Sequence, residues 1–222
     1  MNGPSSFSEL LYPMLSEQPR AAQAVVEELA AAPLEKSQES SRLRELLLAE
    51  QGQEIVDCAL EIADSLLAGG RVLTCGNGGS ATSAADIVAS LMASQPGPAL
   101  PALCLTNDVA VVTAIGNDVS FDDVFSRQVI ALGRPDDVVV AVSTSGSSEN
   151  LVRAVRCAHE RGMLTVALCG YDGGRMRTEA TVDHCFVVRS SSVHRIQEVQ
   201  STLYHLLVDT VQRRVREIRA CA

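Results

Sequence analysis

The chain has 222 residues and a formal net charge of −9; 46% of its residues are hydrophobic and 20% are charged. This length and composition suit one globular domain with a buried core. They exclude a membrane-spanning protein, since no apolar run approaches the ~20 residues that cross a bilayer. The acidic balance disfavours direct binding of nucleic acid, which needs clustered Lys and Arg. The opening residues lack the pattern of a signal peptide, so we expect a cytoplasmic protein.

The first elements in chain order are helical. Residues 1–40 alternate apolar clusters with four prolines, which predicts an N-terminal helical extension of short helices separated by bends. From Ser41 onward apolar residues recur at helical spacing up to Gly69 and Gly70, where we expect the helix to end. We therefore divide the chain into an extension, 1–40, and a globular domain, 41–222.

Short apolar runs then alternate with helical patterns, and a last helical pattern starts at His194. Runs that are apolar on both faces, separated by segments long enough for crossover helices, are typical of a parallel sheet covered on both sides. The fold class predicted is α/β, a doubly wound sheet of five parallel strands flanked by helices. The runs are RVLTC at 71–75, ALCLT at 102–106, DVVVAVS at 137–143, LTVALC at 164–169 and DHCFVV at 183–188.

Two loops that follow predicted strands carry the candidate chemistry: GNGGS at 76–80 and STSGSSEN at 143–150. Ligands of such sheets bind at the carboxyl ends of the strands, where free N–H groups of helix N-termini favour an anion. Glycines allow close approach of the backbone, and serines add short donors for a phosphate. A serine-rich turn alone is equally typical of a helix N-cap, but the pair of loops favours phosphate. The nucleotide motifs GxGxxG and GxxxxGK[ST] are missing from the sequence, which disfavours NAD and ATP.

Four further motifs accompany these loops: IGND at 115–118, DDVFSR at 122–127, GYDGG at 170–174 and RIQE at 195–198. In order and spacing, the six motifs resemble the sugar isomerase (SIS) domain of the sedoheptulose 7-phosphate isomerase, or phosphoheptose isomerase, family. The resemblance covers roughly residues 42–218. It implies a sugar phosphate ligand and a homotetramer whose sites are shared between neighbouring subunits. The substrate-binding residues that it implies are Asn77, Gly78, Ser80, Asp118, Ser143, Thr144, Ser145, Ser148 and Gln197.

The catalytic positions depart from that family. An aldose–ketose isomerase needs a general base near the α-carbon, together with an acid or metal that steadies the enediolate. By the resemblance, the helix after GNGGS should carry a histidine and a glutamate, but this chain has Asp86 and Ser90 there. His205 keeps its family position, eight residues after Gln197. The catalytic candidates are therefore His205 and Asp86. Zinc on Gln197, His205 and Asp86 stays an open alternative, and no other cofactor is expected.

Two functions remain open at this level. The first is isomerisation of a phosphorylated ketose such as sedoheptulose 7-phosphate. The second is a non-catalytic phosphosugar-binding or scaffold protein that serves a protein partner, as in the related DnaA initiator-associating proteins, which also carry a serine at the position of the base. His205 favours the first function and Ser90 favours the second.

Overall fold

The structure is a computed structural model that describes residues 22–93, 97–178 and 182–221. The chain separates into two compact units, Met1–Glu39 and Ser40–Ala222. Helix α2, Ala22–Leu67, continues through Pro33, so the break expected at this proline is wrong. A proline removes one backbone donor, whereas the other turns of a long helix keep their hydrogen bonds. The other three prolines of the extension lie outside the described residues.

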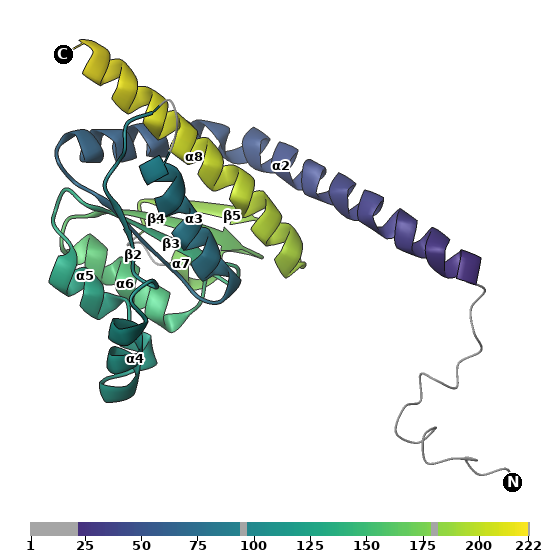
Figure 1. The fold of residues 1–222 in the computed structure, drawn as a ribbon, viewed down its shortest axis with the longest axis horizontal. Helices are drawn as coiled ribbons and strands as arrows, with labels where there is room; N and C mark the ends of the chain where they lie inside the picture. The colour runs from purple at the N-terminus through teal and green to yellow at the C-terminus, as the bar shows by residue number, and fades with distance from the viewer. Residues whose placement is uncertain (1–21, 94–96, 179–181, 222) are drawn as a thin grey trace, which may run out of the picture. The chain divides into compact units, whose positions relative to one another are not determined.

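The larger unit is built on one parallel sheet with the strand order β2-β1-β3-β4-β5, as Figure 1 shows. All five predicted strands are confirmed. In the strand register, Cys75 lies beside Ala141 and Ser143 lies beside Cys169, so β1, β3 and β4 end at one edge of the sheet. The strands are β1 (Val72–Gly76), β2 (Ala102–Cys104), β3 (Val138–Ser143), β4 (Leu164–Gly170) and β5 (His184–Val188).

Helices cover both faces of this sheet (Figure 1). Val138, Val140 and Val142 of β3 pack into a core with residues of α2, α3 and α8, while Val139 and Ala141 pack into a second core with residues of α5 and α6. This alternation explains why the central runs are apolar at every position. The helices after α2 are α3 (Gly79–Ala93), α4 (Val109–Asp118), the short 3-10 helix η2 (Phe121–Asp123), α5 (Ser126–Leu132), α6 (Glu149–Glu160), α7 (Gly174–Thr178) and α8 (Val193–Cys221).

The helix boundaries follow the expected signals. The helix that precedes the sheet ends at Leu67, and Gly69 adopts a φ of 100°, the left-handed conformation of a C-cap glycine. The closing helix begins at Val193, one residue before the predicted start. Within the described ranges, none of the helices combines the length and apolarity needed to cross a bilayer.

Candidate functional site

Two asparagines join the loops that follow β1 and β3. The side-chain nitrogen of Asn77 donates to the amide oxygen of Asn150 at 2.9 Å, and the nitrogen of Asn150 donates back to Asn77 at 3.0 Å. Asn150 is buried, with 2% of its surface exposed. This reciprocal pair fixes the first loop against the second. Asn150 was not among the predicted site residues, because an asparagine in the first turn of a helix is commonplace.

We expect this pair to stabilise the domain cooperatively. Alanine at both positions should show a coupling energy of about 1 kcal/mol or more in a double-mutant cycle, because each single change leaves one amide unpaired. Urea unfolding of the parent, both single variants and the double variant measures it. The cycle of Asn77→Ala with Asn117→Ala, a change at an exposed residue on α4, is the control and should give no coupling. Additive effects at positions 77 and 150 would contradict the pairing.

The serine loop, residues 143–148, lines a small cavity at the carboxyl edge of the sheet. Its first hydroxyl, on Ser143, accepts from the backbone N–H of Gly146 at 3.0 Å and shapes the turn. Ser148 is the N-cap residue of α6, and its side chain makes no capping hydrogen bond to the described residues. The N-terminus of α6 therefore faces a hollow rich in short donors. This cavity, about 60 Å³, is lined by Asn77, Ser80, Val142, Ser143, Thr144, Ser145, Ser148 and Leu151.

Helix α7, which begins at the last glycine of the GYDGG motif, is hydrogen-bonded to the serine loop. The backbone N–H of Met176 donates to the carbonyl oxygen of Gly146 at 2.9 Å, and that of Arg175 donates to the Ser147 hydroxyl at 3.2 Å. Gly146 has a φ of 62°, and a Cβ atom there would collide with the carbonyl group of Gly173. The loop conformation thus depends on glycine at a position that sequence reasoning could not single out.

The charge beside the serine loop is internally compensated. Side-chain hydrogen bonds from Arg153 and then Arg175 lower the pKa of Glu149 to about 2, so this carboxylate stays ionised at neutral pH. The guanidinium groups of Arg153 and Arg175 both pair with Glu149. Neither arginine lines the serine cavity, whose donors are hydroxyl, amide and backbone N–H groups.

The glycine-rich loop, residues 76–80, contacts helix α8. Gly78 has a φ of 54°, a conformation that glycine adopts without strain, and α3 begins directly after it. A Cβ atom at Gly79 would collide with the side-chain nitrogen of Gln197. The structure thus places Gln197 against the start of α3, beside the loop that holds Asn77 and Ser80.

The two catalytic candidates lie side by side, one on α3 and one on α8. The Nε2 atom of His205 is 3.7 Å from the Oδ2 atom of Asp86, and about half of each side chain is exposed. The Nδ1 atom of His205 lies 2.7 Å from the carbonyl oxygen of Ser201. Because a carbonyl oxygen only accepts, Nδ1 carries the hydrogen, and Nε2 of the neutral ring holds the free lone pair.

Tyr204 completes this group and was missed by the sequence reasoning. Its hydroxyl donates to Asp86 Oδ2 at 2.6 Å, and burial together with this hydrogen bond raises the pKa of Tyr204. The phenol therefore stays protonated at neutral pH and orients the carboxylate of Asp86. In the sequence, Tyr204 is one more residue on the buried face of a helix, and nothing in its spacing marks it as a partner of residue 86.

Comparison with known proteins decides the family. The sequence profile described as the SIS domain matches residues 37–170, which is more than half of the chain. The chain belongs to the SIS domain family. Over 174 residues it is 46% identical to a phosphoheptose isomerase of Desulfovibrio desulfuricans, covering 77% of this chain and 81% of the relative. A phosphoheptose isomerase of Aquifex aeolicus is 41% identical over 181 residues, covering 81% and 94%.

Solved structures agree with these relatives. The phosphoheptose isomerase of Neisseria gonorrhoeae superimposes on this SIS domain protein with a TM-score of 0.76 and 39% identity, covering 85% of this chain and 99% of that one. The enzyme of Francisella tularensis gives a TM-score of 0.72 at 31% identity, covering 87% and 100%. The SIS fold that the sequence motifs predicted is thereby confirmed.

Not every predicted residue of the SIS domain converges in one chain. Asp118, at the end of α4, is exposed, accepts from Asn117 at 2.8 Å and does not line the serine cavity. Ser90 and His205 line a second hollow of about 390 Å³, which shares no residue with the serine cavity. The single chain thus presents a small hollow at the serine loop and a separate hollow beside Ser90 and His205.

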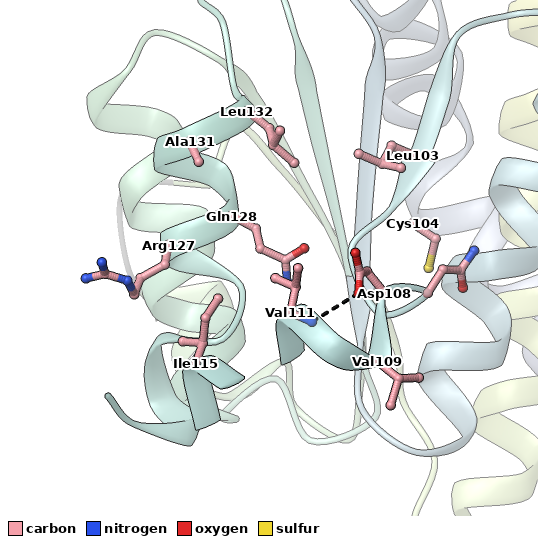
Figure 2. Close-up of a pocket in the computed structure, with 11 residues that line it drawn as sticks. Leu103, Cys104, Asp108, Val109, Val111, Ile115, Arg127, Gln128, Ala131 and Leu132 are labelled. Carbon is pink, nitrogen blue, oxygen red and sulfur yellow. Dashed lines mark hydrogen bonds between the residues drawn. The ribbon is translucent and has the colours of Figure 1, made fainter. Parts of the chain in front are cut away.

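A cavity much larger than the serine cavity lies elsewhere in the fold. It has a volume of about 820 Å³ and lies between β2, α4 and α5, and Figure 2 shows Val109, Val111 and Ile115 of α4 around it with Leu103 of β2. The hydrogen bond drawn there joins Asp108 to the backbone N–H of Val111 at 3.0 Å and begins α4. None of the predicted substrate or catalytic residues lines this cavity. We place the site at the serine loop because polar donors converge there.

The expected zinc ligands, Gln197, His205 and Asp86, do not form a complete zinc site within the described residues. Asp86 and His205 supply two suitable ligand atoms, and no cluster of three His, Cys, Asp or Glu side chains that could hold a metal exists in the part of the chain that is described. Gln197, the third expected ligand, lies against Gly79 at the start of α3, and Asp86 is already bonded to Tyr204. Structural zinc sites use four protein ligands, and catalytic zinc sites use three together with a water molecule. Since only Asp86 and His205 lie together here, we derive no chemical step through zinc.

Proposed function

We propose that this SIS domain protein binds a sugar phosphate at the serine loop and interconverts its aldose and ketose forms, with sedoheptulose 7-phosphate as the substrate. The observation that carries the proposal is the convergence of Ser80, Ser143, Ser145 and Ser148 in one cavity at the N-termini of α3 and α6. Such a cavity suits the phosphate group. The names of the relatives in the phosphoheptose isomerase group support the choice of sugar.

In this proposal, His205 is the general base. Its Nε2 lone pair takes a proton from C1 of the ketose, which gives an enediolate. The hydroxyl proton of O1 passes to O2, and the imidazolium returns its proton to C2, so that C1 becomes the carbonyl carbon of the aldose. Asp86 stabilises the transient positive charge at 3.7 Å, and Tyr204 holds Asp86 in place. The hydroxyl of Ser90 shares the hollow with His205 and supplies a hydrogen-bond donor, but it offers no carboxylate base.

The distance along α3 between Ser80, at the serine cavity, and Asp86, a catalytic candidate, fits a long sugar phosphate. Ser80 and Asp86 are six residues apart on this helix, and six residues advance about 9 Å along a helix axis. An extended seven-carbon chain has a comparable reach between its phosphate and its carbonyl end. The phosphate at Ser80 would then leave C1 and C2 at the level of Asp86 along the axis of α3.

We further propose a cytoplasmic homotetramer. Helix α4 has no buried residue although most of its side chains are apolar, and Val109 is 68% exposed, while Phe121 of η2 is 59% exposed. A second copy that packs there would bury this apolar surface. Asp118, which lies outside the serine cavity of its own chain, would then be available to the site of a neighbouring subunit. Size-exclusion chromatography with light scattering tests the tetramer, and a monomeric mass would contradict it.

The decisive experiment follows sedoheptulose 7-phosphate by proton NMR with purified protein, once with zinc and once with a chelator, beside a thermal-shift titration with the same sugar. We expect conversion to the aldose phosphate together with thermal stabilisation. Loss of conversion with the chelator alone would show that a metal takes part. Stabilisation without conversion in either arm would contradict the isomerase.

Stabilisation without conversion would instead favour the second candidate function, that of a phosphosugar-binding or scaffold protein with a protein partner. Ser90 favours it, because a serine stands where the resemblance places the catalytic glutamate. The same cavity would hold the sugar phosphate, and the protein would act through a partner rather than through turnover.

The serine loop gives a test of binding alone. Ser145→Ala combined with Ser148→Ala should abolish thermal stabilisation by sedoheptulose 7-phosphate, because both hydroxyls line the cavity while the Ser143 bond that shapes the turn is kept. Ser65→Ala on α2 is the control, and it should keep the full thermal shift. Equal shifts in the parent and the double variant would reject the phosphate cradle.

A further inference from the structure

The hollow of about 390 Å³ beside His205 includes a carboxylate that the proposed mechanism does not use. Asp209 lines this hollow and lies on α8, four residues after His205. Side chains four residues apart share one face of a helix, with their Cβ atoms about 5–6 Å apart. The Asp209 carboxylate and the His205 imidazole therefore border the same space. We call this space the histidine hollow; its lining residues are Ala89, Ser90, Ala93, His205, Val208 and Asp209.

The carboxylate of Asp209 carries an uncompensated charge. Its side chain is exposed and makes no hydrogen bond or ion pair with any residue that the structure describes. No lysine or arginine is among the described residues that line the histidine hollow. The other charged group beside His205 is a second carboxylate, that of Asp86, at 3.7 Å. This end of the proposed site thus carries a net negative charge whether His205 is neutral or protonated.

The serine cavity has a different electrostatic character. The residues that line it are uncharged, and they include Ser148, the N-cap residue of α6, so the positive end of this helix dipole lies beside the cavity. The nearby charge of Glu149 is paired with Arg153 and Arg175. An anion is therefore favoured at the serine loop and disfavoured in the histidine hollow.

We propose that Asp209 is a specificity-determining residue, which restricts the site to ketose monophosphates with a free hydroxyl on C1. The proposal rests on the proposed function, because it places the C1 end of the sugar in the histidine hollow. A hydroxyl on C1 donates a hydrogen bond to the Asp209 carboxylate. A phosphate on C1 meets a like charge that no cation in the described lining offsets, and such a contact discriminates against the wrong ligand.

Sedoheptulose 1,7-bisphosphate is the probe for this effect. It has the same carbon chain as sedoheptulose 7-phosphate and differs from it by the phosphate on C1. Whichever of its two phosphates binds at the serine loop, the other is left at the end of the site that holds Asp209. A unit negative charge about 6 Å from a carboxylate, at an effective dielectric constant of about 40, weakens binding by about tenfold.

The test measures the dissociation constants of both sugars for the full chain by isothermal titration calorimetry. The parent should bind the bisphosphate at least about tenfold more weakly than the 7-phosphate. Asp209→Asn keeps the size of the side chain and one acceptor oxygen but removes the charge, so it should narrow this ratio by about tenfold while binding of the 7-phosphate changes little. Raising the salt concentration should narrow the ratio of the parent and leave that of Asp209→Asn nearly unchanged, because salt screens exposed charges.

Glu217→Gln is the matched control. Glu217 is another exposed carboxylate of α8, eight residues after Asp209 and outside the histidine hollow. The change removes the same charge from the same helix and should leave the ratio of the parent. Equal ratios in the parent and in Asp209→Asn, or equal narrowing by Glu217→Gln, would overturn the proposal, while binding of the 7-phosphate would still support the proposed function. A parent that binds neither sugar would refute the proposed function and this proposal with it.

Discussion

Replacing His205 by glutamine is expected to lower turnover of sedoheptulose 7-phosphate by about 10²-fold or more. Glutamine keeps the polarity and approximate size of the side chain but has no basic lone pair for the proton of C1. The phosphate end is untouched, so thermal stabilisation by the sugar should persist and the loss should appear in kcat rather than in KM. Asp86→Asn removes the charge that faces Nε2 at 3.7 Å and should also lower kcat.

His159→Gln is the matched control for this prediction. His159 lies on α6, is also about half exposed, and faces a carboxylate, that of Asp183, at 4.0 Å. The pairing resembles that of His205 with Asp86, but it involves none of the residues assigned to the site. Its turnover should equal that of the parent. Unchanged turnover in His205→Gln and Asp86→Asn would remove this pair from the mechanism.

Gly146→Ala should be the most damaging change in the phosphate end of the site. A left-handed conformation costs an alanine about 1–2 kcal/mol, and here the added methyl would also collide with the carbonyl group of Gly173. We expect a loss of about 3 kcal/mol or more in the free energy of unfolding. Binding of the sugar phosphate should be lost as well, because the carbonyl oxygen of Gly146 accepts one hydrogen bond from Met176 and its N–H donates one to Ser143.

Gly162→Ala is the control that separates the backbone strain of a left-handed alanine from the collision with Gly173. Gly162 has a φ of 72°, close to the 62° of Gly146, but the nearest atom to an added methyl is a side-chain carbon of Pro135 at 4.0 Å. This variant should lose only the conformational cost of about 1–2 kcal/mol and keep its ligand. Urea unfolding with equal m values measures both variants. Equal destabilisation of the two would show that the contact with Gly173 does not support the serine loop.

The pattern of the sequence was sufficient for the sheet and for the edge at which the two candidate loops meet. Residues of β3 alternate between two cores, so the run was apolar throughout and predicted a strand buried on both faces. Parallel strands end at the same edge, and the glycine-rich and serine-rich loops therefore had to meet there. Six of the serine, threonine and asparagine residues implied by the resemblance line one cavity there.

Only the tertiary structure decided how these parts connect. The hydrogen bond between Tyr204 and Asp86 joins residues 118 positions apart, and the amide pair of Asn77 and Asn150 joins residues 73 positions apart. Local periodicity reports which face of a helix is buried, but it does not report which residue of another helix lies opposite. For the same reason Asp118, whose motif pointed to the pocket, lies outside the serine cavity of its own chain. The sequence thus determined the five strands and the edge of the sheet at which the two loops meet, and packing determined which side chains lie together.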